Sequence, residues 1–205
     1  MEDWALRSLA RWPDVPALYG WLGLDRRGRW LIRGETITRP QIIDTINRNY
    51  AADARGRWYF QNGPQRGYVE LASAPLILRT AAQGDILHTH TGLEVSRIAE
   101  AYLDEEGSVL LTTEHGAAAF ADHELDWLLP RLATAQGVVD EPALAAALAL
   151  PSSATTALSL WLGTERYPLQ RLDRALAPAT LGYVRVPVPQ PGERAVVGES
   201  ARAPD

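Results

Sequence analysis

The chain has 205 residues, of which 46% are hydrophobic and 22% charged, a composition that suits one large or two small globular domains. Cysteine is absent and all 20 basic residues are arginine, which excludes disulfides, thiolate nucleophiles, cysteine-bound metals and lysine Schiff-base chemistry. The formal net charge of −5 is unevenly distributed, because residues 1–79 are net basic and residues 80–205 are net acidic. Either the two halves complement each other, within the fold or across a dimer, or the basic half binds an anionic ligand or nucleic acid.

A Leu-Asp-x-x-Gly-x-x-Leu motif occurs twice, at residues 24–31 and again at residues 103–110. An aspartate that opens a tight turn accepts hydrogen bonds from the backbone amides that follow it, and glycine supplies the left-handed residue that closes a type I turn with a bulge. The two copies therefore predict β-hairpins with turns at 25–28 and 104–107. A third Asp-x-x-Gly turn is predicted at residues 53–56.

Apolar residues with helical spacing follow the first two hairpins, over residues 37–48 and 120–131. In the first segment, Thr38 and Gln41 have the spacing of a capping box. In the second, Asp122 is the expected N-cap. Each of these two hairpins, together with the segment that follows it, therefore predicts a unit made of a hairpin, a short strand and a helix. The second unit repeats the first.

The rest of the chain predicts shorter elements. Three strands, an alanine-rich helix and a last hairpin are expected at residues 68–71, 76–78, 86–91, 140–150 and 157–172. Asp140 is the natural N-cap of the alanine-rich helix. From residue 187 onward the sequence is rich in proline, glycine and charge, and too poor in apolar residues to order itself.

These elements predict an α+β fold of repeated β-hairpin–strand–helix units packed around antiparallel sheets. We expect a first unit over residues 1–82, with a preceding helix, and a second over residues 83–186, with a C-terminal helix and hairpin. Residues 187–205 are expected to form a disordered tail.

Three stretches, Tyr19–Asp25, Ile46–Tyr50 and Phe60–Arg66, read Tyr-Gly-Trp-Leu-Gly-Leu-Asp, Ile-Asn-Arg-Asn-Tyr and Phe-Gln-Asn-Gly-Pro-Gln-Arg. In these stretches the chain resembles an uncharacterised proteobacterial family of unknown function, and the resemblance extends to about residue 187. It implies no catalytic residues. The hairpins and the Ala74-Pro75-Leu76 turn are also similar, more distantly, to a second bacterial family of unknown function, which implies a sensing or signalling role.

Two histidines form a candidate metal site. His88 and His90 lie two positions apart on a predicted strand, which would place both rings on one face about 7 Å apart, and Glu94 would add a carboxylate. The His-x-His-x-x-x-Glu pattern resembles the first motif of the cupins. The alternative is that these histidines make structural hydrogen bonds or face solvent.

Amides, guanidinium groups and phenols cluster in sequence around the end of the first helix and the third hairpin. This candidate ligand-binding set is Asn47, Arg48, Asn49, Tyr50, Gln61, Asn62, Gln65, Arg66 and Tyr68. The two arginines would bind a carboxylate or phosphate while the amides orient it. The alternative is that Asn62-Gly63 is simply a tight turn and that the asparagines end a helix.

No serine-nucleophile elbow or glycine-rich phosphate loop occurs in the sequence. We therefore expect a non-catalytic module in bacterial regulation that binds a small anionic ligand or a protein partner. The alternatives are a metal-dependent enzyme that uses His88 and His90, and a structural homodimer. We expect no cofactor, no nucleic acid partner and no membrane association, and a cytoplasmic location, because the start of the chain lacks a signal-peptide pattern.

Overall fold

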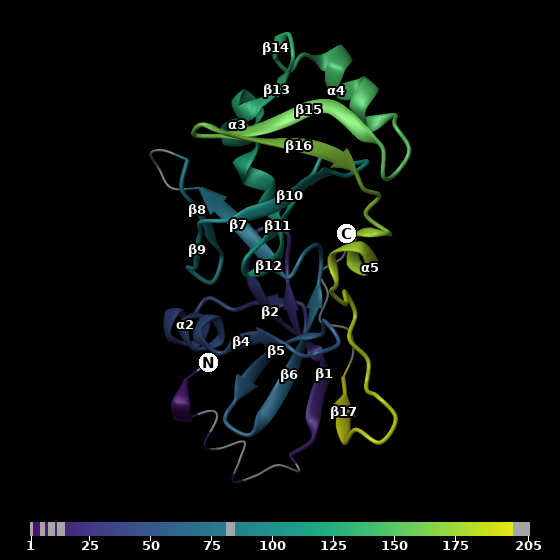
Figure 1. Ribbon diagram of the computed structural model, residues 1–205. Coiled ribbons are helices and arrows are strands. Elements are labelled where there is room, and N and C mark those ends of the chain that lie inside the picture. The colour runs from purple at the N-terminus through teal and green to yellow at the C-terminus, as the bar shows by residue number, and fades with distance from the viewer. Residues whose placement is uncertain (1, 5–6, 8–10, 12–14, 81–84, 199–205) are drawn as a thin grey trace. The chain divides into compact units, whose positions relative to one another are not determined.

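A computed structural model describes residues 2–4, 7, 11, 15–80 and 85–198. The chain divides into two compact units (Figure 1). Unit 1 consists of Met1–Pro75 and Gly182–Asp205, and unit 2 is Leu76–Leu181. This grouping differs from the domains expected from the sequence, because the chain returns to unit 1 after unit 2. The helix expected at the start of the first unit falls mostly on residues outside those described.

Unit 1 contains one sheet with the strand order β3-β2-β1-β6-β5-β4. Its elements are β1 (Ala17–Leu24), β2 (Trp30–Ile32), β3 (Glu35–Thr36), α2 (Pro40–Arg48), β4 (Tyr50–Ala52), β5 (Trp58–Asn62), β6 (Gln65–Leu71) and β17 (Ala195–Val197). β1 is antiparallel to β2 and parallel to β6, whereas β4, β5 and β6 form an antiparallel meander. The unit is therefore a sheet-rich α+β structure.

The three Asp-x-x-Gly turns are hairpins, as predicted from the sequence. In each turn one carboxylate oxygen of the aspartate accepts two backbone amides, those of the second and fourth residues after it, at 2.7–3.0 Å from Asp25, Asp53 and Asp104. The glycines have φ between 73° and 85°, a region that other residues seldom adopt. The local chemistry of four residues thus sets these turns.

Helix α2 begins one residue later than the capping-box pattern indicates. Its N-cap is Arg39, whose side chain makes no capping bond, and Pro40 occupies the first turn. The prediction that Thr38 caps this helix is therefore wrong. Pro40 favours this start because it needs no amide partner and its fixed φ suits the first helical position.

The core of unit 1 is partly aromatic. Tyr19 of β1 and Tyr68 of β6 stack with ring centroids 4.6 Å apart, and Tyr59 of β5 meets Tyr68 edge-on at 5.8 Å. Ala17 completes this buried cluster, and Ala195 of β17 packs against it. Residues 187–198, which we call the C-terminal segment, therefore contribute to the packing of unit 1 through Ala195.

Strand β1 has two halves with different neighbours on one edge. Its second half, Leu22–Leu24, pairs with β2, which is only three residues long. Its first half, Ala17–Tyr19, pairs with β17 in parallel. Gly20, with φ 73°, lies between the halves and interrupts the strand geometry. Residues 187–198, expected to be disordered, thus include a strand; residues 199–205 of the expected tail lie outside the described part of the chain.

Unit 2 contains a ten-stranded sheet with the order β14-β13-β15-β16-β10-β11-β12-β7-β8-β9. Its strands are β7 (Leu76–Thr80), β8 (Leu87–Thr89), β9 (Glu94–Val95), β10 (Ile98–Leu103), β11 (Val109–Thr113), β12 (Gly116–Phe120), β13 (Leu132–Thr134), β14 (Gly137–Val138), β15 (Thr155–Leu162) and β16 (Glu165–Arg171). β10, β11 and β12 form a meander, and β16 lies parallel to β10. Unit 2 is thus also dominated by strands.

The helices of unit 2 are short. They are η1 (Asp122–Glu124), α3 (Leu125–Leu128), η2 (Leu129–Arg131), α4 (Glu141–Leu148) and α5 (Ala177–Leu181). Asp140 caps α4, as predicted, because its side chain accepts the amide of Ala143 at 2.9 Å. Asp122 makes no capping bond and opens a 3₁₀ turn, so its prediction as an N-cap is wrong. No helix among the described residues is both long and apolar enough to cross a membrane.

Candidate functional site

The structure does not bring the nine residues of the candidate ligand-binding set together: seven belong to three separate local networks, and Tyr50 and Asn62 lie outside them. At the end of α2, Asn47 accepts the indole N–H of Trp30 at 2.8 Å. The side chain of Asn49 is buried; its oxygen accepts the amide of Glu2 and its nitrogen donates to the carbonyl of Thr45. Arg48 is mostly exposed and pairs with Glu2 at 3.3 Å. The two asparagines at this helix end therefore serve the fold.

A second network lies in the β5–β6 hairpin. The buried amide of Gln61 donates to the carbonyl of Gly63 at 2.8 Å and accepts Nε of Arg66 at 3.1 Å. The guanidinium of Arg66 also lies 4.4 Å from the ring centroid of Tyr59. Gln65 donates to the carbonyl of Pro16. These bonds shape the hairpin and use polar groups that the sequence suggested for a ligand.

The remaining members of the set lie apart from these groups. Asn62 is exposed at the tip of the hairpin. The hydroxyl of Tyr50 donates to the carbonyl of Pro75 at 3.0 Å. The hydroxyl of Tyr68 belongs to a third network, centred on Arg57, which the sequence did not single out.

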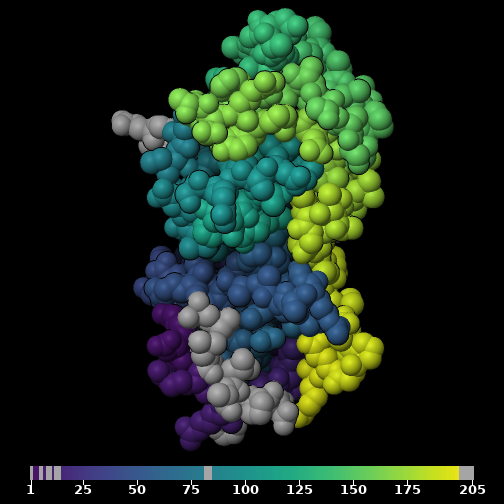
Figure 2. All heavy atoms as spheres, viewed as in Figure 1, coloured from purple at the N-terminus to yellow at the C-terminus, as the bar shows by residue number. Residues whose placement is uncertain are grey.

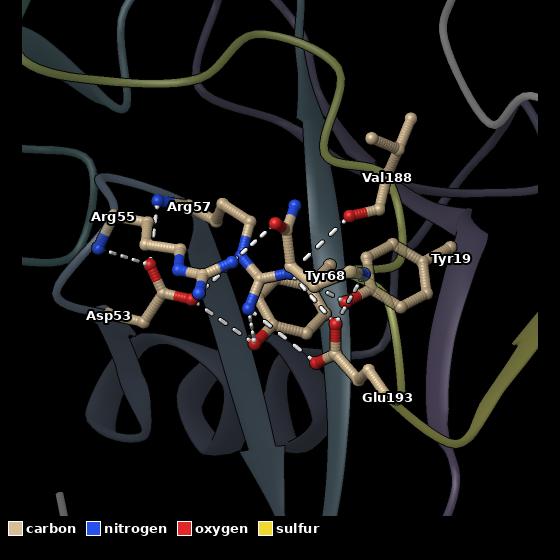
Figure 3. A network of polar contacts seen from close by, with 8 residues as sticks. Tyr19, Asp53, Arg55, Arg57, Tyr68, Val188 and Glu193 are labelled. Carbon is tan, nitrogen blue, oxygen red and sulfur yellow. Dashed lines mark hydrogen bonds and ion pairs between the residues drawn. The ribbon is translucent and has the colours of Figure 1, made fainter.

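Arg57 is the centre of a polar cluster in unit 1 (Figure 3). It follows the third hairpin turn, and its Nε binds Asp53 at 2.7 Å. Its Nη1 binds Tyr19 at 3.0 Å and Glu193 at 2.9 Å, and its Nη2 binds the hydroxyl of Tyr68 at 2.9 Å. The guanidinium carbon is also 4.4 Å from the centroid of the Tyr68 ring. We call these five residues the Arg57 network.

The Arg57 network joins distant parts of the sequence. Glu193 and the carbonyl of Val188, which accepts Nη1 at 3.3 Å, come from the C-terminal segment, whereas Asp53 is in the third hairpin turn. Each of the three guanidinium nitrogens of Arg57 has a partner within unit 1. The arrangement is therefore suited to holding the C-terminal segment against the sheet, and it offers an incoming anion little free hydrogen-bonding capacity.

The charges of the Arg57 network stabilise one another. Burial by itself would raise the pKa of Asp53 and of Glu193, but hydrogen bonds from Arg57 and from neighbouring backbone amides together outweigh it and hold each pKa below its ordinary value. Burial raises the pKa of Tyr19 and of Tyr68, so both phenols stay protonated. The network therefore contains one cation and two carboxylates at neutral pH, with neutral phenols beside them.

The histidines suggested for a metal have unlike surroundings. His90 is buried, and its Nδ1 accepts the amide of Ile77 at 3.2 Å. Burial, with a smaller effect from the charge of Arg79, lowers the pKa of His90 to about 3. His88 lies on β8 opposite Glu94 of β9 and is partly exposed. Across the described residues, no three His, Asp or Glu side chains form a group that could hold a metal ion.

Comparison with known proteins places the chain in a family without assigning an activity. Two solved structures are similar to it, both of DUF1285 family proteins. The protein from Silicibacter pomeroyi DSS-3 shares 16% identity, with a TM-score of 0.47, over 79% of this chain and 86% of that one. The protein from Shewanella baltica OS155 shares 16% identity, with a TM-score of 0.39, over 54% of this chain and 88% of that one.

No curated protein matches the chain. A family model does match it, over residues 1–188, which is most of its length. The chain therefore belongs to the DUF2944 family, described as "Protein of unknown function (DUF2946)".

Proposed function

We propose that this chain is a non-catalytic protein-interaction module in bacterial regulation. The observation that carries the proposal is that the sheet of unit 1 holds a short extended stretch from the end of the chain, β17 (Ala195–Val197), in parallel against Ala17–Tyr19 of β1. Addition of an extended segment to a sheet is a common mode of peptide recognition, since backbone bonds supply affinity and side-chain contacts supply specificity.

The polar side chains favour this function over binding of a small anion. Gln61 and Asn49 are bonded within the fold, and Arg66 is held by Gln61 and stacks on Tyr59. A small anion would have to displace these partners, and an unpaired buried polar group costs about 1–3 kcal/mol. Of the candidate ligand-binding set, Arg48 and Asn62 are the members whose side chains are mostly exposed, and they remain open to a ligand.

A screen separates the two kinds of partner. The full chain would be tested for binding to an array of extended peptides and, by thermal shift, to phosphate, carboxylates and nucleotides. We expect saturable binding to a subset of the peptides and an unchanged melting temperature with the small anions. If a small anion raises the melting temperature, Arg66→Ala abolishes that shift and no peptide binds, the protein-interaction proposal is wrong.

We also propose that units 1 and 2 are two copies of one folding unit. The strand order β3-β2-β1-β6-β5-β4 of unit 1 matches the order β12-β11-β10-β16-β15-β13 in unit 2, with β14 and α4 added in the chain between β13 and β15, and this match supports the proposal. A helical segment follows β3 in unit 1 and β12 in unit 2. In the same way, β6 lies parallel to β1, and β16 lies parallel to β10. The amide of Ala72 binds the carbonyl of Leu24 at 2.9 Å, and the amide of Leu172 binds that of Leu103 at 3.0 Å.

An exchange of turns tests the duplication. Replacing residues 25–29 by the sequence of residues 104–108 should change the free energy of unfolding by less than about 1 kcal/mol, because both turns use the same aspartate and glycine geometry. Urea titration would measure the effect. A loss of several kcal/mol would show that the two hairpins are not equivalent.

A further inference from the structure

The first half of β1 presents a sheet edge that the neighbouring hairpin does not cover. β2 pairs only with Leu22–Leu24, because it is three residues long. In unit 2 the corresponding strand, β11, pairs along β10 from Ile98 to Leu103. The edge of β1 at Ala17–Tyr19, which β2 leaves uncovered, is therefore a feature of unit 1. In the structure, β17 pairs with this edge.

β17 is a weakly buried occupant of this edge. It is three residues long, and the side chains of Val196 and Val197 are 45% and 65% exposed. The stretch that leads to it, residues 186–192, contains three prolines and a glycine and no helix or strand. In the space-filling view, the yellow atoms of this segment lie on the outside of unit 1 (Figure 2). Few apolar contacts would be lost if the segment left the edge.

Three positions of the segment nevertheless contact unit 1 specifically. Glu193 places its carboxylate on the buried Arg57 at 2.9 Å. Two residues later, Ala195 packs against the tyrosine cluster of the core. Gly198 lies against the indole of Trp21, where a Cβ atom would overlap Nε1 and lie 2.7 Å from Cδ1.

The backbone of the segment is bonded at both ends of the strand. The amide of Ala17 donates to the carbonyl of Arg194 at 2.9 Å, and the amide of Gly198 donates to the carbonyl of Tyr19 at 2.8 Å. These bonds do not depend on side-chain identity. Any extended segment with an acid, a small residue and a glycine at the spacing of residues 193, 195 and 198 would make the same contacts.

We propose that the first half of β1, with Arg57 and Trp21, is a strand-accepting site for an extended segment of a partner protein that carries an acidic residue, a small residue and a glycine at this spacing. Residues 193–198 are its intramolecular occupant, which a partner segment of the same pattern displaces. The inference rests on the proposed protein-interaction function and names the partner class. Arg57, the cation of the site, favours a partner segment that carries a carboxylate at the position of Glu193.

Residues 193–198 compete with a partner segment for the site. Weakening the contacts of these residues with the site should therefore increase the binding of an added peptide. The probe is a fluorescent peptide with the sequence of residues 187–198, added to the full chain and followed by polarisation. The Glu193→Gln chain, whose resident segment loses its carboxylate, should bind this peptide about tenfold more tightly than the unaltered chain.

Matched controls separate the site from general effects on folding. A peptide with valine in place of Gly198 should lose binding at least about tenfold, because its side chain would overlap Trp21. A peptide with glutamine in place of Glu193 should bind about tenfold more weakly. Both peptides leave the protein unaltered. The Arg29→Gln chain should bind like the unaltered chain, because Arg29 pairs with Asp25 in a different turn.

Three results would overturn the inference. The first is the absence of saturable peptide binding to a folded Glu193→Gln chain. The second is equal binding of the Gly198→Val peptide. The third is exchange of the segment between two labelled copies of the full chain that is tighter than peptide binding, since the occupant would then be a second copy. Binding of other peptides in the array, unaffected by Arg57→Gln, would leave the proposed function standing and remove this site.

Discussion

Replacing Arg57 by glutamine should destabilise unit 1 far more than the matched change at Arg29. Both arginines follow an Asp-x-x-Gly turn and bind its aspartate through Nε, at 2.7 Å and 2.6 Å. The side chain of Arg57 is 9% exposed and that of Arg29 is 52% exposed. The pair of variants therefore compares one local geometry in a buried and an exposed setting.

The magnitude follows from the partners that each arginine leaves behind. Without Arg57, Asp53 and Glu193 remain partly buried without the cation they share, and the hydroxyls of Tyr19 and Tyr68 lose a donor. Breaking a buried ion pair costs about 3–5 kcal/mol. Glutamine restores part of the hydrogen bonding, so we expect about 3 kcal/mol. Loss of an exposed ion pair such as that of Arg29 costs about 0–1 kcal/mol.

Urea titration of the full chain, followed by tryptophan fluorescence and far-ultraviolet circular dichroism, measures the difference. Because two units can unfold in separate steps, hydrogen exchange of β1 and β17 amides would assign the loss to unit 1. A destabilisation by Arg57→Gln within about 1 kcal/mol of that by Arg29→Gln would refute the view that the Arg57 network holds the C-terminal segment in place.

Three further changes test other parts of the fold. Gly56→Ala should lower the free energy of unfolding by at least about 1 kcal/mol more than Gly107→Ala, as measured by urea titration. Both glycines have positive φ, but of the two only Gly56 lies where a Cβ atom would overlap a backbone carbonyl, that of Gly182. Equal losses for the two variants would contradict this contact. Asp104→Ala should cost about 1–2 kcal/mol, measured in the same way, since two turn amides lose their acceptor. His90 stays neutral in the folded chain down to a pKa of about 3, whereas the unfolded chain takes up a proton below its ordinary pKa of 6.5. The stability of unit 2 should therefore fall as the pH drops from about 6.5 to 3, and His90→Gln should flatten this slope in melting curves recorded against pH.

The elements that the sequence predicted correctly depend on local chemistry. Asp25, Asp53 and Asp104 bond to amides within four residues, so each turn is encoded where it occurs. The same holds for Asp140 at the start of α4. Thr38 was misplaced as a cap because the pattern of a threonine and a glutamine competes with Pro40, which fixes the first turn.

The Arg57 network could not be located from the sequence because its members are distant in the chain. Arg57 and Glu193 are 136 positions apart, and nothing near either residue identifies the other. One local signal was available: an arginine stands four residues after the turn aspartate in two hairpins, Arg29 after Asp25 and Arg57 after Asp53. The composition of residues 187–198 predicted disorder, and the strand there forms because β1 offers an uncovered edge.

The return of the chain after Gly182 makes unit 2 an insertion within unit 1. During synthesis, all of unit 2 emerges from the ribosome before the last strand of unit 1 does. Unit 2 is therefore free to fold first, while β1 waits with one edge uncovered and Arg57 lacks its second carboxylate. Unit 1 is therefore begun before unit 2 and completed after it, and for that interval the edge of β1 is open to pairing with other polypeptides.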